Sequence, residues 1–145
     1  IDCADQQHRL RLRSYVWADQ PARLQRLDAA LGLAETPPFP LAKADAATFL
    51  REELATRRDD AAFVLFHSIM WQYLPAAAKD EIAADLELAG RAATQAAPIA
   101  WLRMEPLATT DRHATMSLTL WPGGGTKTLA RCDYHGRWIE WLDQP

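Results

Sequence analysis

Cysteine and positive charge are both scarce in this sequence of 145 residues. The two cysteines, Cys3 and Cys132, are too few and too far apart to indicate a disulfide-stapled scaffold or a zinc site, so a reducing cytoplasm is the expected location. The 16 lysine and arginine residues are outnumbered by 19 aspartate and glutamate residues, and the net charge is −3. This balance gives no general attraction to phosphate backbones, so nucleic acid is not an expected partner.

The sequence also lacks a segment that could cross a membrane. Its uncharged stretch over residues 61–78 contains His67, Gln72 and Pro75, and it falls short of the roughly 20 mostly apolar residues that a spanning helix needs. It shows no signal peptide, and a membrane is not an expected partner. Because the chain begins at Ile1 without a methionine, we expect a fragment of a longer protein.

Glycine motifs that cradle phosphates or activate a nucleophile are missing as well. No Gly-x-Gly-x-x-Gly occurs, and neither does the Gly-x-Ser-x-Gly turn of many hydrolases. The triple glycine within residues 123–127 is expected to lead into a strand, whereas a phosphate loop leads into a helix. We therefore interpret it as a hairpin loop.

The sequence does contain enough apolar residues, 49%, for one well-buried domain over residues 1–145. Asp5 is expected to cap a first helix, although residues 10–16 also alternate like a strand. Pro21 occupies a natural first helical position, and the leucines that follow it form one stripe at helical spacing.

The next segments alternate between strand and helix signals. Phe39–Ala44 is a short apolar segment that predicts a strand, and Asp45 is the expected N-cap of a helix over Ala46–Thr56. Ala61–Phe66 is a continuous apolar run, typical of a central parallel strand covered on both faces. After a long amphipathic helix, Ile99–Met104 predicts a third strand.

This order predicts an α/β fold with a three-layer, Rossmann-like, mainly parallel sheet. Past Glu105 the connection is too short for a parallel crossover, so the pairing is expected to turn antiparallel. Thr115–Trp121 and Thr126–Tyr134 then form a C-terminal hairpin, followed by an alternating tail over Arg137–Leu142. In the first of these strands the threonine and serine side chains are expected to face solvent.

Polar side chains follow each of the three expected parallel strands. Asp45 follows the first, His67 and Ser68 the second, and Glu105 the third. Ligands bind outside the carboxyl ends of parallel strands, so these residues are expected to share one crevice. The expected ligand-binding residues of this crevice are Asp45, Gln72, Tyr73 and Glu105.

His67 and Ser68 are the candidate catalytic residues, because an unperturbed imidazole has a pKa near 6.5 and can act as an acid or base. As neighbours on a strand they point to opposite sides, which argues against a hydrolase pair. A plainer interpretation makes Asp45 and Ser68 helix caps and His67 a partly buried histidine with satisfied hydrogen bonds. The four histidines lack the spacing of a metal site.

Five segments combine tryptophan, histidine and proline at unusual spacing. They are RLRSYVWADQPARLQRLDAAL, FHSIMWQYLP, AWLRMEP, LTLWPGG and DYHGRWIEWL. In this order they closely resemble the C-terminal half of the bacterial domain-of-unknown-function 2332 (DUF2332) family. The resemblance implies a longer protein whose N-terminal half carries a glycine segment absent here, in a layout similar to that of class I methyltransferases. Asp45 would then lie where such enzymes hold adenine, and His67 and Ser68 beside the substrate.

Three functional hypotheses follow. The first is a methyltransferase-like protein of unknown substrate that binds S-adenosylmethionine only at full length. The second is a non-catalytic module whose tryptophan-rich hairpin and tail contact a second copy, another protein or the missing N-terminal half. The third is a nucleotide-dependent hydrolase or transferase that uses His135 and Arg137 on an anionic substrate.

Overall fold

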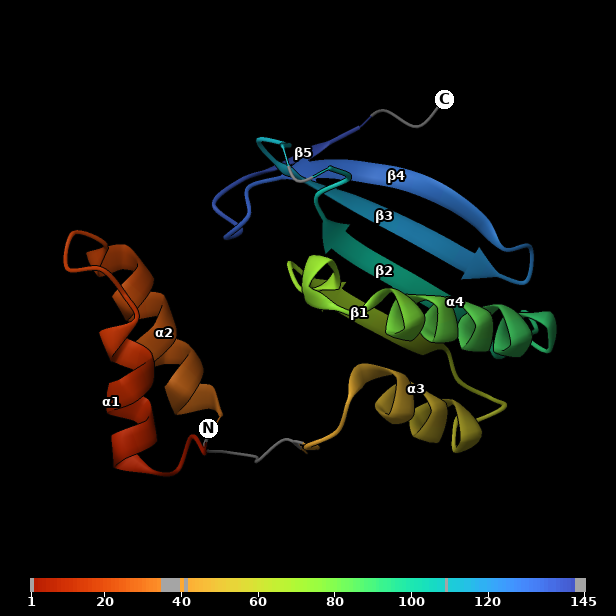
Figure 1. Ribbon diagram of the computed structural model, residues 1–145, viewed down its shortest axis with the longest axis horizontal. Helices are drawn as coiled ribbons and strands as arrows, with labels where there is room; N and C mark the ends of the chain where they lie inside the picture. The colour runs from red at the N-terminus through yellow and green to blue at the C-terminus, as the bar shows by residue number, and fades with distance from the viewer. Residues whose placement is uncertain (1, 35–39, 41, 109, 143–145) are drawn as a thin grey trace. The chain divides into compact units, whose positions relative to one another are not determined.

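The computed structural model describes residues 2–34, 40, 42–108 and 110–142. These residues belong to two compact units, Ile1–Lys43 and Ala44–Pro145 (Figure 1). The second unit contains the sheet and the candidate site. The single domain expected over residues 1–145 stays a prediction.

The described residues of the first unit form two helices, α1 (Gln6–Ser14) and α2 (Pro21–Leu33). Asp5 caps α1 because its side chain accepts hydrogen bonds from two backbone N–H groups of the first turn. Pro21 begins α2, where its missing N–H has no intrahelical partner to lose. Both helical predictions are confirmed.

The second unit packs two helices on a five-stranded sheet. The helices are α3 (Ala46–Ala55) and α4 (Ala76–Arg91), and a short 3₁₀ helix, η1 (Trp71–Tyr73), precedes α4. The strands, in their order across the sheet, are β1 (Phe63–Ser68), β2 (Ile99–Glu105), β3 (Ala114–Trp121), β4 (Gly125–Cys132) and β5 (Ile139–Trp141) (Figure 1). The pair β1 and β2 is parallel, and the other neighbours are antiparallel. The α/β class and the antiparallel C-terminal hairpin are confirmed.

The more specific expectation of a Rossmann-like, mainly parallel sheet in three layers is wrong. One strand pair is parallel, and the core residues of α3 and α4 pack together on one face of the described sheet. The first expected strand, Phe39–Ala44, lies partly outside the described residues, and its described residues 40 and 42–44 are not in a strand. Among the described residues, the strand–helix–strand crossover from β1 through α4 to β2 gives the one parallel pair of the sheet.

Strand β1 lies at an edge of the described sheet, not at its centre. Phe63 and Leu65 pack against the helices, whereas the intervening Val64 and Phe66 are more than half exposed. An apolar run indicates a strand, but it does not tell whether the second face is covered. The prediction of burial on both faces therefore fails at this strand.

The core lies between the helix pair and the sheet. Leu50 of α3, Leu86 of α4 and Ile99 of β2 are fully buried there. Trp121 of β3 packs against α4 so closely that a side chain at Gly90 would collide with its indole ring. Glycine at this position therefore allows the helix to approach the sheet.

Strand β3 packs its polar face inward, against expectation. Thr115 and Thr119 are buried, whereas Leu120 on the opposite face is about half exposed. The register pairs Thr119 with Trp101 and Thr115 with Glu105 on β2. These hydroxyl side chains therefore share a sheet face with the charged residues described below.

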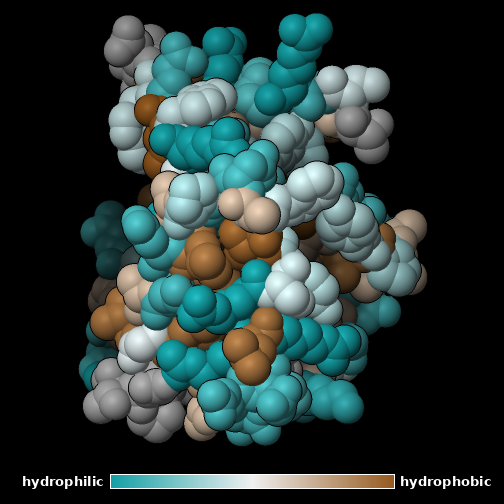
Figure 2. Space-filling view, turned by 90° about the vertical axis from the view of Figure 1, so that its left-hand side faces the viewer, coloured by the Kyte–Doolittle hydropathy of each residue, from teal (hydrophilic) through white to brown (hydrophobic). Residues whose placement is uncertain are grey.

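Large apolar side chains also reach the surface. Figure 2 shows hydrophobic residues between hydrophilic ones on the face that it presents. No helix in the described ranges has both the length and the apolar content to cross a membrane.

Candidate functional site

His67 lies at the centre of a hydrogen-bonded chain that joins β1 to β2. The indole Nε1 of Trp101 donates to His67 Nε2 at 3.0 Å. On the other side of the ring, His67 Nδ1 lies 2.7 Å from Glu105 Oε1. The imidazole also stacks on Trp71, with 5.0 Å between the ring centroids. The aromatic rings pack against the imidazole, whose side chain is 9% exposed, and fix its orientation.

These contacts define the protonation state of His67. An indole N–H can only donate, so His67 Nε2 must accept and cannot carry a proton. The hydrogen therefore resides on Nδ1 and is donated to Glu105. His67 is a neutral imidazole with both nitrogens engaged, which leaves neither free to act on a substrate.

Glu105 also holds the turn between β1 and η1. It is 8% exposed, and its Oε1 accepts from the backbone N–H groups of Met70 at 3.1 Å and Trp71 at 3.2 Å. Ile69 in the same turn has a φ of 52°, an unfavourable value for a β-branched residue. Glu105 thus stabilises a strained turn while its own Oε2 lacks a partner among the described residues.

A polar cavity of about 350 Å³ lies beside Glu105 on the same sheet face. Its lining residues come from η1, from β2 and the loop after it, and from β3 and β4. They are Trp71, Arg103, Glu105, Pro106, Leu107, Thr115, Ser117, Thr126 and Thr128. The cavity therefore combines one cation, one carboxylate and several hydroxyl groups with an aromatic wall.

Arg103 is the cation of this cavity. Its Nη2 donates to the hydroxyl of Thr119 at 2.7 Å, and its Cζ lies 4.1 Å from the centre of the Trp101 ring. Burial lowers the pKa of the guanidinium, but an arginine still keeps its charge at neutral pH. No carboxylate in the described ranges forms an ion pair with it, and its Nε has no partner there.

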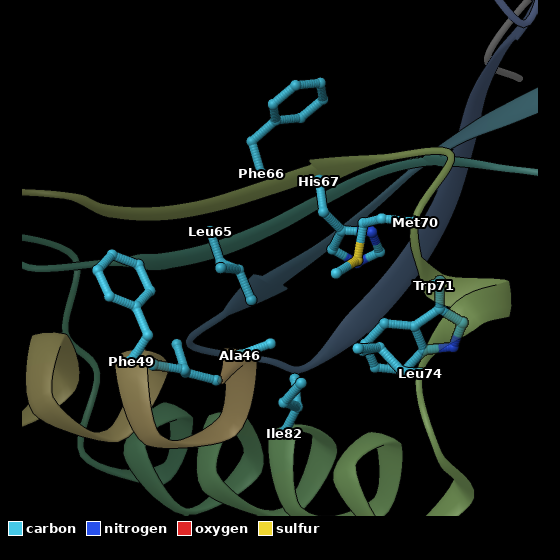
Figure 3. Close-up of a pocket in the computed structure, with 10 residues that line it drawn as sticks. Ala46, Phe49, Leu65, Phe66, His67, Met70, Trp71, Leu74 and Ile82 are labelled. Atoms are coloured by element: carbon cyan, nitrogen blue, oxygen red, sulfur yellow. The ribbon is translucent and has the colours of Figure 1, made fainter. Parts of the chain in front are cut away.

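A second, apolar cavity of about 180 Å³ lies between β1, α3 and α4. In Figure 3, Leu65, His67 and Ile82 point into it, whereas Phe66 points away on the other side of β1. Trp71 lines both cavities. The apolar cavity has no charged lining residue, so the polar cavity is the stronger candidate site.

The structure brings together only part of the expected crevice. His67 and Glu105 are in direct contact, as their positions at strand ends suggested. The prediction that His67 and Ser68 point to opposite sides agrees with the alternating burial of β1, and Ser68 is exposed. His67 as a free acid or base is not supported, because both of its nitrogens are occupied.

The other expected site residues line neither cavity. Asp45 caps α3 by accepting from the Thr48 N–H at 3.0 Å, and this bond holds the pKa of its carboxyl below the ordinary value. Gln72 and Tyr73 are exposed on η1. His135 and Arg137 are exposed in a turn whose backbone N–H groups donate to Asp133, and neither residue lines the polar or the apolar cavity.

Sequence reasoning missed Arg103, which is the only charged residue within Ile99–Met104. Its position two residues before Glu105 places both side chains on one face of β2. It also missed the cavity hydroxyls, because alternating threonines were interpreted as a solvent face. A lone arginine in a buried strand was the signal that could have located the cavity.

No arrangement for a metal ion is evident, since no group of three histidine, cysteine, aspartate or glutamate side chains in the described segments could hold one.

Replacing Glu105 tests how much its hydrogen bonds contribute to the stability of the fold. Glu105→Ala removes the acceptor of three N–H donors and should lower the free energy of unfolding by about 3 kcal/mol or more. Glu105→Gln keeps an acceptor oxygen and should cost about 1–2 kcal/mol. Urea unfolding followed by circular dichroism measures both. Equal stability of the alanine variant and the wild type would contradict the assigned role.

The sequence matches one known protein family. A family model described as an uncharacterized protein conserved in bacteria (DUF2332) matches residues 1–141. No curated protein and no solved structure gives a significant match. The match confirms the family resemblance over nearly the whole chain. It supports neither the narrower assignment to a C-terminal half nor the methyltransferase analogy.

Proposed function

The chain belongs to the DUF2332 family of uncharacterised proteins conserved in bacteria, and we propose that its polar cavity binds a small molecule. Arg103 would hold an anionic group of this molecule. The main observation behind this proposal is that Arg103, at the wall of this cavity, forms no ion pair with a carboxylate in the part of the chain that the structure describes. A partly buried charge without a counter-ion is costly. A carboxylate or phosphate of a ligand would supply the missing partner and form charge-assisted hydrogen bonds.

The remaining lining residues suit a polar molecule of modest size. Thr115, Ser117 and Thr126 carry hydroxyl groups that can donate or accept hydrogen bonds. The volume of about 350 Å³ lies at the small end of ligand pockets. Trp71 adds apolar ring atoms to the lining, which can contact the apolar part of such a molecule.

This proposal differs from the three hypotheses drawn from the sequence. The methyltransferase hypothesis depended on a mainly parallel sheet, and the described sheet has one parallel pair. His135 and Arg137, which the third hypothesis placed on an anion, are exposed and do not line the polar cavity. We favour a binding protein over an enzyme that uses His67, because the hydrogen bonds of His67 occupy both of its ring nitrogens.

Titration calorimetry with phosphate, acetate, propionate and lactate tests the anion site. At least one of these anions should bind saturably to the wild-type chain. Arg103→Met should weaken that binding at least tenfold, and Arg103→Lys, which keeps the charge, should retain part of it.

Circular dichroism of both variants controls for their folding. Failure of all four anions to bind at millimolar concentration would refute the proposal, as would equal binding by the methionine variant.

A second candidate is self-association through the C-terminal strand. Trp138 and Trp141 are 46% and 66% exposed, and Ile139 between them is about half exposed. Strand β5 is also the other edge of the described sheet, where unpaired backbone groups can accept another strand. These features favour the interaction module inferred from the tryptophan-rich tail.

Light scattering over a range of protein concentrations tests this second candidate. The wild-type chain should associate as its concentration rises, and the double variant Trp138→Ser/Trp141→Ser should remain monomeric. Tyr73→Ser removes an exposed aromatic side chain from η1 and serves as the matched control. A wild-type chain that is monomeric at every concentration would rule out self-association through the C-terminal strand.

A further inference from the structure

The anion site also contains a carboxylate, and this pairing narrows the class of ligand. Arg103 and Glu105 are two residues apart on β2 and line the same cavity. At a strand rise of about 3.3 Å per residue, their Cα atoms lie about 7 Å apart. One small molecule can therefore contact both side chains at once.

We infer that the cavity binds a zwitterion of the α-amino acid type, with its carboxylate on Arg103 and its ammonium group on Glu105. This inference rests on the proposed anion site and adds recognition of the ligand's ammonium group by Glu105. The two charged groups of an α-amino acid sit on the same carbon, so a molecule of this class can span the gap between the two side chains.

The state of Glu105 supports an ammonium group at this position. Three donors occupy Oε1, while Oε2 is buried and has no partner in the described segments. A buried acceptor without a donor costs free energy that a new donor recovers. Glu105 lines the cavity, so Oε2 is the carboxylate oxygen that the described residues leave for a ligand, while Oε1 keeps its three donors.

The charge balance disfavours other small ligands. The cavity residues carry one positive and one negative side chain, so a zwitterion satisfies both without adding net charge. A dianion would gain from Arg103 but would be repelled by Glu105. A neutral polyol could use the hydroxyl groups of Thr115 and Ser117, but it would leave both charges without a counter-ion.

The test compares matched molecules that differ in one group. Each of the twenty standard amino acids is screened for thermal stabilisation of the full chain, and the best is titrated by calorimetry beside its α-hydroxy and deamino analogues. The amino acid should bind at least tenfold more tightly than the hydroxy acid, and the deamino acid should bind most weakly. Glu105→Gln should remove the preference for the amino group, so that the amino acid binds no more tightly than its hydroxy and deamino analogues.

The outcomes separate this inference from the anion site itself. If the three analogues bind equally and Arg103→Met weakens them all, the anion site stands and the zwitterion assignment is wrong. If no amino acid stabilises the chain while phosphate or acetate binds, the zwitterion assignment is again wrong. If nothing binds, both proposals fail. Circular dichroism of Glu105→Gln shows that any loss of preference does not come from unfolding.

Discussion

The carboxylate of Glu105 is the contact on which the rest of the site depends. One oxygen accepts from His67 on β1 and from two backbone N–H groups of the turn before η1, while the residue itself belongs to β2. These bonds fix the parallel strand pair, the strained turn at Ile69 and the position of Trp71 together. Buried polar networks of this kind are specific because each missing partner is costly.

Glu105 contacts the structural imidazole of His67 on one side and lines the polar cavity on the other. Glu105 and Trp101 occupy both nitrogens of His67, which makes the histidine part of the framework. On the other side of Glu105, the cavity contains a set of hydroxyl groups and Arg103, which forms no ion pair with any carboxylate among the described residues. The chemistry of the site therefore lies in the charged residues of β2, and the aromatic residues position them.

The sequence predicted local elements well and the sheet less well. Asp5, Pro21 and Asp45 marked three helix starts correctly, because capping depends on adjacent residues. The strands were also located, but their neighbours depend on contacts between distant segments. The apolar run in β1 was expected to be central, and the threonines of β3 were expected to face solvent. His67 and Glu105 were found from strand ends, whereas Arg103 needed the register of β2 and β3.

The most direct test of this account is the nitrogen NMR spectrum of the His67 ring in protein labelled with ¹⁵N at histidine, assigned with a His67→Gln variant. The account predicts a neutral ring at pH 7, with a protonated Nδ1 coupled to its hydrogen and an unprotonated Nε2 that accepts from Trp101. A ring protonated on both nitrogens, or on Nε2 alone, would contradict it.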